Sequence, residues 1–301
     1  MSIRATANTF NDAFIRDFQS KNNEMVKQQI NLSTGQSVRS PSDDPAVMRR
    51  VMISESEKRE MVQHRHNHNY ATQIDRVSHG ALNNLHDVLS RASLVASTTD
   101  GLKDDAGYAQ RADEIDNLIE QALPILNRNY NGEYLFGGDQ FDTVSFTATR
   151  DGSNKVTSVS YTGSATASEF YVATGVKMPS RLSPTDTQKF SDLMNRMISL
   201  RDNITSVNQS GIATDIVNLN TSENDLLASK SSQGSNTARL EMLKAHDDAI
   251  YRSREEQISR SVDSDLAASM QKVLQLQTAI EASMQSGVML MKSNNILNYL
   301  R

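Results

Sequence analysis

The spacing of apolar residues constrains this chain most strongly, because it follows a helical period over long stretches on both sides of a short middle segment. Steps of three and four connect one such set, Ile74, Val77, Ala81, Leu85, Val88, Ala92 and Val95, and a second set, Phe190, Leu193, Met197, Leu200, Ile204 and Val207. This spacing places an apolar stripe along one face of a helix. We therefore predict long helices packed through coiled-coil-like seams, although the stripes alone fit an ordinary helical bundle as well.

Between about Asn131 and Pro179 the pattern changes to alternation and turn residues. Strands are expected at 141–146, 156–161 and 169–173, with a turn at 151–155, and the helical period returns after Pro184. A helix from about Pro45 to Thr99 would be on the order of 80 Å long at 1.5 Å per residue. The predicted fold is mainly α and elongated, with long antiparallel helices, coiled coil from both chain ends and a small β-rich insert in the middle.

The same pattern predicts three parts. Residues 1–44 with 262–301 are expected to be terminal, core-forming coiled-coil segments, residues 45–130 with 185–261 a helical rod, and residues 131–184 a small β-rich outer subdomain. Pro124 lies inside an apolar helical stretch, so a kink or an early helix end is expected there.

Composition excludes several classes of function. The chain has no cysteine, which excludes disulfides and thiolate chemistry. Its net charge is -5 and it contains no long basic block, so the sequence offers no basic surface that would bind nucleic acid. No apolar run approaches the roughly 20 residues of a membrane helix, and residues 1–10 lack the apolar core of a secretory signal. We therefore expect no membrane insertion, and any export would need a route other than a cleaved signal peptide.

The segment 32–45 (LSTGQSVRSPSDDP) predicts a joint between two helices. Gly35 suits the left-handed cap that ends a helix, and Pro45 suits the first position of the next one. Asp44 is placed to cap that helix through its carboxylate, while Asp43 would lie favourably near its positive end.

Both chain ends carry apolar seams that lack an obvious partner. The predicted assembly residues are Phe10, Phe14, Phe18, Met25 and Leu32 in the N-terminal segment, with Leu266, Met270, Val273, Ile280, Met284 and Met291 in the C-terminal one. A lone chain would gain little from ordering such ends, so we expect them to be mobile until assembly. The alternative is an intramolecular coiled coil in the monomer.

The sequence contains no set of residues typical of a catalytic or cofactor-binding site. His64 and His68 would share one helical face and His66 would point away, yet no carboxylate lies on the same turn, so a solvated face is favoured over a metal site. His79, His86 and His246 are expected at the surface or its rim. Phosphate loops, zinc-protease motifs and nucleophile elbows are missing from the sequence, and we expect neither an enzyme nor a cofactor.

At the joint the chain resembles the flagellin superfamily of bacterial flagellar axial proteins, which carry a related Ser-x-Gly and Asp-Asp signature after their first helix. The sequence SPSDDP at 40–45 is similar to the corresponding segment of hook-associated junction members of this superfamily, whereas filament flagellins usually have DDAAG at this place. Other segments agree in chain order: NGEYLFGG at 131–138, SYTG at 160–163, GSNTARL at 234–240 and LNYLR at 297–301.

The resemblance implies a structural adaptor at the hook–filament junction, outside the cell, that assembles through its terminal helices. It also implies certain partners: other copies in a ring, a neighbouring hook-associated junction protein, flagellin, and an export chaperone on the C-terminal segment. Two alternatives stay open, a short filament flagellin and, from another class, a rod-like coiled-coil binding or signalling protein.

Overall fold

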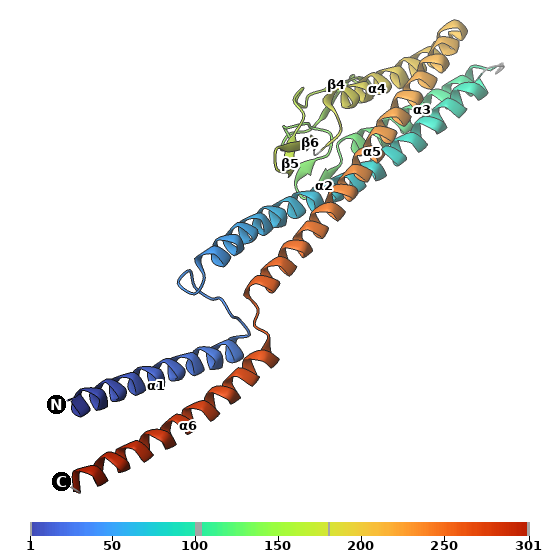
Figure 1. Cartoon of the computed structure of the whole chain (residues 1–301). Coiled ribbons are helices and arrows are strands. Elements are labelled where there is room, and N and C mark those ends of the chain that lie inside the picture. The colour runs from blue at the N-terminus through green and yellow to red at the C-terminus, as the bar shows by residue number, and fades with distance from the viewer. Residues whose placement is uncertain (1, 100–103, 180, 300–301) are drawn as a thin grey trace. The chain divides into compact units, whose positions relative to one another are not determined.

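The computed structural model describes residues 2–99, 104–179 and 181–299, and it describes side chains from residue 12 to residue 289 within those ranges. The elements in chain order are α1 (Ser2–Thr34), α2 (Pro45–Thr99), α3 (Asp105–Leu126), β1 (Asn129–Tyr130), β2 (Glu133–Tyr134), β3 (Phe146–Arg150), β4 (Val156–Tyr161), β5 (Glu169–Ala173), β6 (Val176–Pro179), α4 (Pro184–Thr205), α5 (Gln209–Val262) and α6 (Leu266–Tyr299) (Figure 1). The prediction of a mainly helical fold with a small β insert is confirmed.

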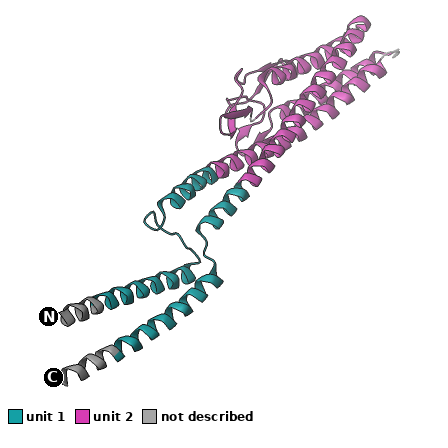
Figure 2. Ribbon diagram, in the orientation of Figure 1, with its two compact units in different colours: residues 1–59, 251–301 teal, residues 60–250 magenta. Residues whose placement is uncertain are grey.

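The chain divides into two compact units. Unit 1 holds residues 1–59 and 251–301, and unit 2 holds residues 60–250 (Figure 2). The two long helices α2 and α5 each contribute residues to both units. The three-part division expected from the sequence stays a prediction.

The core of unit 2 lies where α2, α3, α4 and α5 pack together. Their apolar stripes supply Leu85, Ile119, Met197 and Leu219, each of which is fully buried. These stripes show the steps of three and four that were recognised in the sequence, so the amphipathic pattern accounts for the helical packing. The helix α3 ends at Leu126, two residues after Pro124, in agreement with the expected early end.

The β insert consists of three antiparallel two-stranded pairs, β1 with β2, β3 with β4, and β5 with β6. The strands β4 and β5 coincide with the predicted ranges 156–161 and 169–173. The first predicted strand is wrong: the structure forms β3 at 146–150, not a strand at 141–146. The side chain of Asn127 fixes the start of β3, because it accepts a hydrogen bond from the Phe146 amide at 2.9 Å and donates to the Phe146 carbonyl at 2.8 Å.

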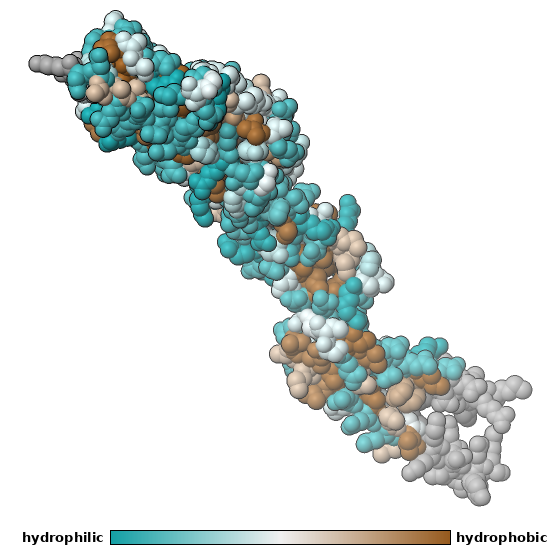
Figure 3. All heavy atoms as spheres, turned by 180° about the vertical axis from the view of Figure 1, so that it is seen from behind, coloured by the Kyte–Doolittle hydropathy of each residue, from teal (hydrophilic) through white to brown (hydrophobic). Residues whose placement is uncertain are grey.

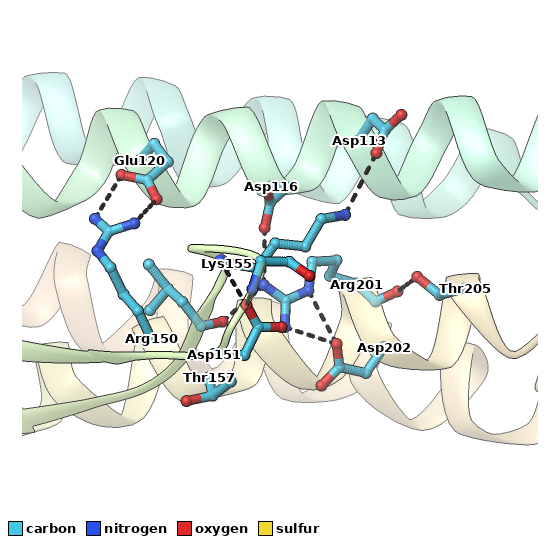
Figure 4. Close-up of polar contacts among 12 residues, drawn as sticks. Asp113, Asp116, Glu120, Arg150, Asp151, Lys155, Thr157, Arg201, Asp202 and Thr205 are labelled. Carbon is cyan, nitrogen blue, oxygen red and sulfur yellow. Dashed lines mark hydrogen bonds and ion pairs between the residues drawn. The ribbon is translucent and has the colours of Figure 1, made fainter.

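Charged pairs attach the β3–β4 hairpin to the helices (Figure 4). Three carboxylates along α3 each meet a basic side chain, Asp113 with Lys155, Asp116 with Arg201 and Glu120 with Arg150. Arg201 on α4 is the buried member: its guanidinium donates to Asp116 Oδ1 at 2.8 Å and to the Val156 carbonyl at 2.7 Å. This guanidinium therefore links α3, β4 and α4.

A polar stretch interrupts the contact between α2 and α5 in unit 2. Asp75 is buried there and accepts hydrogen bonds from the Thr237 hydroxyl at 3.2 Å and from Gln233 Nε2 at 3.5 Å. Burial raises the pKa of Asp75 to about 6, and the two hydrogen bonds only partly oppose this shift. An ionised carboxylate is thus held in a place that disfavours its charge.

We predict that Arg201→Ala lowers the free energy of unfolding of unit 2 by about 2 to 3 kcal/mol, because it removes charge-assisted hydrogen bonds and leaves their acceptors unpaired. Arg150→Ala is the matched control: its ion pair with Glu120 is partly exposed to solvent, with 31% and 41% of the two side chains accessible, so we expect a loss below about 1 kcal/mol. Urea unfolding followed by circular dichroism measures both. Equal losses for the two variants would contradict the linking role of Arg201.

We also predict that Asp75→Asn stabilises unit 2 at pH 7 by on the order of 2 kcal/mol, since one pKa unit corresponds to about 1.4 kcal/mol. The folded pKa of Asp75 lies above its ordinary value of 3.8, so between about pH 4 and pH 6 the native chain retains a proton that the unfolded chain has lost. The wild type therefore loses stability as the pH rises from about 4 to 6, and the asparagine variant lacks that loss. Thermal midpoints of both proteins at pH 4 and pH 7 test this; a gain of equal size at both values would contradict it.

Candidate assembly surface on the terminal helices

The segments next to the terminal helices are joined by backbone hydrogen bonds in unit 1. The Ser37 amide donates to the Val262 carbonyl at 2.7 Å, and the Ser264 amide donates to the Gly35 carbonyl at 2.8 Å. Gly35 adopts a positive φ of 71°, and its amide closes the end of α1 on the Asn31 carbonyl at 2.8 Å. The left-handed turn at Gly35 therefore directs the chain out of α1 and into contact with the start of α6.

The two aspartates of the joint, Asp43 and Asp44, accept hydrogen bonds from different parts of the chain: Asp44 from the start of α2, and Asp43 from the loop before it. Asp44 Oδ1 accepts hydrogen bonds from the amides of Ala46 at 2.9 Å and Val47 at 3.0 Å, so it caps the start of α2 at Pro45. Asp43 Oδ2 instead accepts from the amides of Arg39 and Ser40 in the preceding loop. These backbone hydrogen bonds, from Arg39 first, hold the pKa of Asp43 below its usual value.

The helices α1 and α6 pack side by side in unit 1 and run antiparallel. Near the joint Gly35 meets Ser264, farther along Lys21 Nζ donates to Ser283 Oγ at 3.3 Å, and beyond that Phe14 lies against Gly287. A Cβ atom added at Gly287 would lie 2.7 Å from the Phe14 ring. The glycine thus allows the aromatic side chain to approach the backbone of α6 closely.

The residues predicted as an assembly seam fall on different faces of these two helices. Phe14, Phe18, Met25, Leu32 and Ile280 are half-buried, and Val273 is buried. Leu266, Met270 and Met284 stay exposed, with 52%, 60% and 54% of their surface accessible. The side chains of Phe10 and Met291 lie outside the described residues.

Sequence reasoning missed part of this surface. Leu276 is buried beside Val273, whereas Leu274 and Val288 join the exposed set on α6. Apolar residues thus lie on more than one face of α6. These missed residues could have been found from the density of apolar residues around the whole helix. A single heptad seam uses only two positions in seven, so a higher density indicates more than one apolar face.

The histidine run does not form the solvated face that was favoured from the sequence. His68 is fully buried, and its Nε2 lies 3.3 Å from Asp247 Oδ2 on α5, while His64 Nδ1 lies 3.9 Å from the same oxygen. The carboxylate comes from a distant part of the chain, which periodicity cannot reveal. In the part of the chain that the structure describes, no group of three or more histidine and acidic side chains could hold a metal ion.

Close packing accounts for the glycine motif at 131–138. Phe136 is buried with its ring edge-on to Phe190 at 5.7 Å, and the two following glycines bring the backbone against the rest of the insert. A Cβ at Gly137 would lie 2.4 Å from the Gln140 carbonyl oxygen, and one at Gly138 would lie 2.9 Å from two such oxygens. No other residue fits there without a backbone shift.

The comparisons with known proteins agree with this arrangement. Residues 7–140 match the model of the bacterial flagellin N-terminal helical region. This part of the chain, which includes most of the N-terminal helix α1, is thus similar to flagellin.

Among curated proteins, the chain is similar to flagellar hook-associated protein 3 of Escherichia coli K12, with 24% identity over 279 residues that cover 86% of this chain and 88% of that protein. Two solved structures share its fold. A flagellar hook-associated protein of Vibrio parahaemolyticus superposes with a TM-score of 0.64 at 15% identity, covering 73% of this chain and 100% of that one. The flagellar junction protein FlgL of Legionella pneumophila gives a TM-score of 0.52 at 11% identity, covering 71% and 100%. The resemblance to hook-associated protein 3 inferred from the sequence is confirmed.

None of the helices in the described ranges combines the length and the apolarity that a membrane crossing requires.

We predict that Gly35→Ala weakens the pairing of the joint segments, because a side chain in the left-handed conformation costs about 1 to 2 kcal/mol. Hydrogen exchange at the amides of Ser37 and Ser264 should become faster in this variant. Gly80→Ala is the control: Gly80 lies inside α2 with open space around it and should tolerate a methyl group or gain stability from it. Unchanged exchange at both amides in Gly35→Ala would show that the joint does not depend on this glycine.

Proposed function

We propose that this chain is a structural subunit of the bacterial flagellum, an adaptor at the hook–filament junction that assembles through its terminal helices and connects the junction to the flagellin filament. The observation that carries the proposal is the exposed apolar surface of α6, which α1 leaves uncovered. The similarity to hook-associated protein 3 over most of the chain supports it.

The helix α1 covers only part of the apolar surface of α6. Packing against α1 buries the stripe that contains Val273 and Leu276, yet Met270, Leu274 and Val288 remain more than half exposed. Burying such apolar surface contributes roughly 25 cal/mol per Å², so neighbouring subunits would gain substantially by covering it. A helix with apolar residues on several faces is typical of a buried position. In this chain that position would exist only in the assembly.

We infer the partners from this role. They are further copies of the chain in a ring, a neighbouring hook-associated junction protein, flagellin, and an export chaperone that binds the C-terminal segment. The chain would act outside the cell, after export through the flagellar type III apparatus. Its role would be mechanical, with no catalytic reaction and no cofactor.

A short filament flagellin is the nearest alternative, and a rod-like coiled-coil binding protein is a more distant one. Deletion of the gene, followed by electron microscopy of the cells and a protein stain of the medium, separates the three. The junction role predicts bare hooks with flagellin released into the medium. Loss of the major filament protein itself would indicate a flagellin, and normal motile flagella would contradict both flagellar roles.

We predict that Met284→Asp and Ile280→Asp leave unit 2 folded but block incorporation, because each places a charge on the apolar surface of α6 that must lose water on assembly. Met242→Asp is the matched control, since Met242 is an exposed methionine on α5 in unit 2. Complementation of the deletion strain, scored by filament number per cell, should fail for the α6 variants and succeed for the control. Normal filaments with Met284→Asp would rule out this helix surface as an assembly contact.

A further inference from the structure

A second uncovered apolar surface lies in unit 1, at the start of α2. Pro41, Pro45, Met48, Met52 and Ile53 line a shallow groove there together with Arg49 and Ser56, and Met52 and Ile53 are each more than half exposed. We call this surface the α2 groove. On the face of the molecule drawn in Figure 3, brown apolar surface gathers over the parts of the chain next to the grey atoms of the chain ends.

The rest of unit 1 leaves the α2 groove open because it packs on the other side of the helix. Ser54 is buried, and it follows Pro45 by nine residues, or about two and a half helical turns, so it points away from the groove. The contacts with α5 in this unit use Glu57, which pairs with Arg254, and Lys58, whose ammonium lies over the Tyr251 ring. None of these side chains lines the groove.

The positive charge of Arg49 makes the groove favour a partner with an acidic residue. Arg49 lies in its wall and is exposed, and no ion pair of its guanidinium occurs within the described part of the chain. An apolar floor beside a free guanidinium fits an apolar helix that carries an acidic residue at one end. Acidic groups at an interface with a basic partner guide the approach and fix the register.

The chain itself contains such a helix. The first turns of α6 expose Leu266, Met270 and Leu274 at steps of four, a stripe about 12 Å long, whereas the groove from Pro45 to Ser56 is about 16 Å long. Asp265 directly precedes the stripe and is exposed. Methionines on both surfaces can adjust their side chains to a neighbouring helix.

We propose that the α2 groove of one copy receives the stripe of Leu266, Met270 and Leu274 from a second copy, with Arg49 near the acidic start of that stripe. This inference rests on the proposed function and deepens it by naming a contact between copies. Because the groove and the stripe are different surfaces, each copy offers both. The contact is therefore head-to-tail and continues from copy to copy, unlike the contact of a symmetric dimer, which uses one surface twice.

The absence of cysteine from the sequence makes a direct test possible. The double variant Met52→Cys with Met270→Cys replaces the wild type in motile cells, and their isolated flagella are oxidised and probed with an antibody against the chain. The expected products are disulfide-linked multimers, starting at twice the chain mass of 33.4 kDa. The control double variant Met242→Cys with Met270→Cys, in which the first thiol lies on α5, should remain a monomer.

Three outcomes would overturn the proposal: absence of multimers from flagella of motile cells, disulfide dimers of Met52→Cys alone, or a product in which Met52→Cys is linked to a different protein. The first of these leaves the junction role intact, because motility and the deletion phenotype report on that role separately. In the double variant, Arg49→Glu should lower the yield of multimers by about fivefold, since it places like charges together, and Arg49→Lys should preserve the yield. Equal yields for the two would contradict the part assigned to Arg49.

Discussion

The backbone hydrogen bonds between the segment after α1 and the segment before α6 are the contact on which unit 1 depends. They join residues more than 220 positions apart in the sequence, through Ser37 with Val262 and Ser264 with Gly35. These hydrogen bonds hold the end of α1 beside the start of α6, and the register of the antiparallel helices that places Phe14 against Gly287 is consistent with this joint. A shift by one turn would bring the Phe14 ring against a side chain where it now meets a glycine.

The helices differ in how completely their own chain can bury them. In unit 2 the amphipathic helices α3 and α4 turn one apolar face inward, and residues such as Ile115 and Leu200 are fully buried. In unit 1 the helix α6 packs against α1, and its described residues present more than one apolar face. The same physical effect, burial of apolar surface, thus completes the core of unit 2, whereas in the described residues of unit 1 part of the apolar surface of α6 stays uncovered.

The sequence predicted those parts of the fold that depend on local patterns. It located α2 from Pro45 to Thr99 because a proline and an acidic cap begin that helix and an apolar stripe continues along it. It also located β4, whose turn at Asp151 is closed by hydrogen bonds from the Ser153 and Lys155 amides to one carboxylate oxygen. Features that require distant residues were not predictable. His68 is buried beside Asp247 of α5, 179 positions away, and β3 begins where Asn127 binds Phe146.

Sequence periodicity also failed to predict which apolar residues of the candidate assembly surface are buried. Periodicity identified α6 as a helix with unpaired apolar residues, but it assigned Leu266, Val273 and Met284 to one seam, whereas the structure buries Val273 against α1 and exposes the other two. Spacing in a sequence tells which residues share a helix face only when a single face is apolar. Where apolar residues lie on several faces of the helix, the neighbouring helix determines which of them are buried. In this chain that neighbour is α1, which the joint at Gly35 holds beside α6, and the faces that α1 does not cover stay exposed.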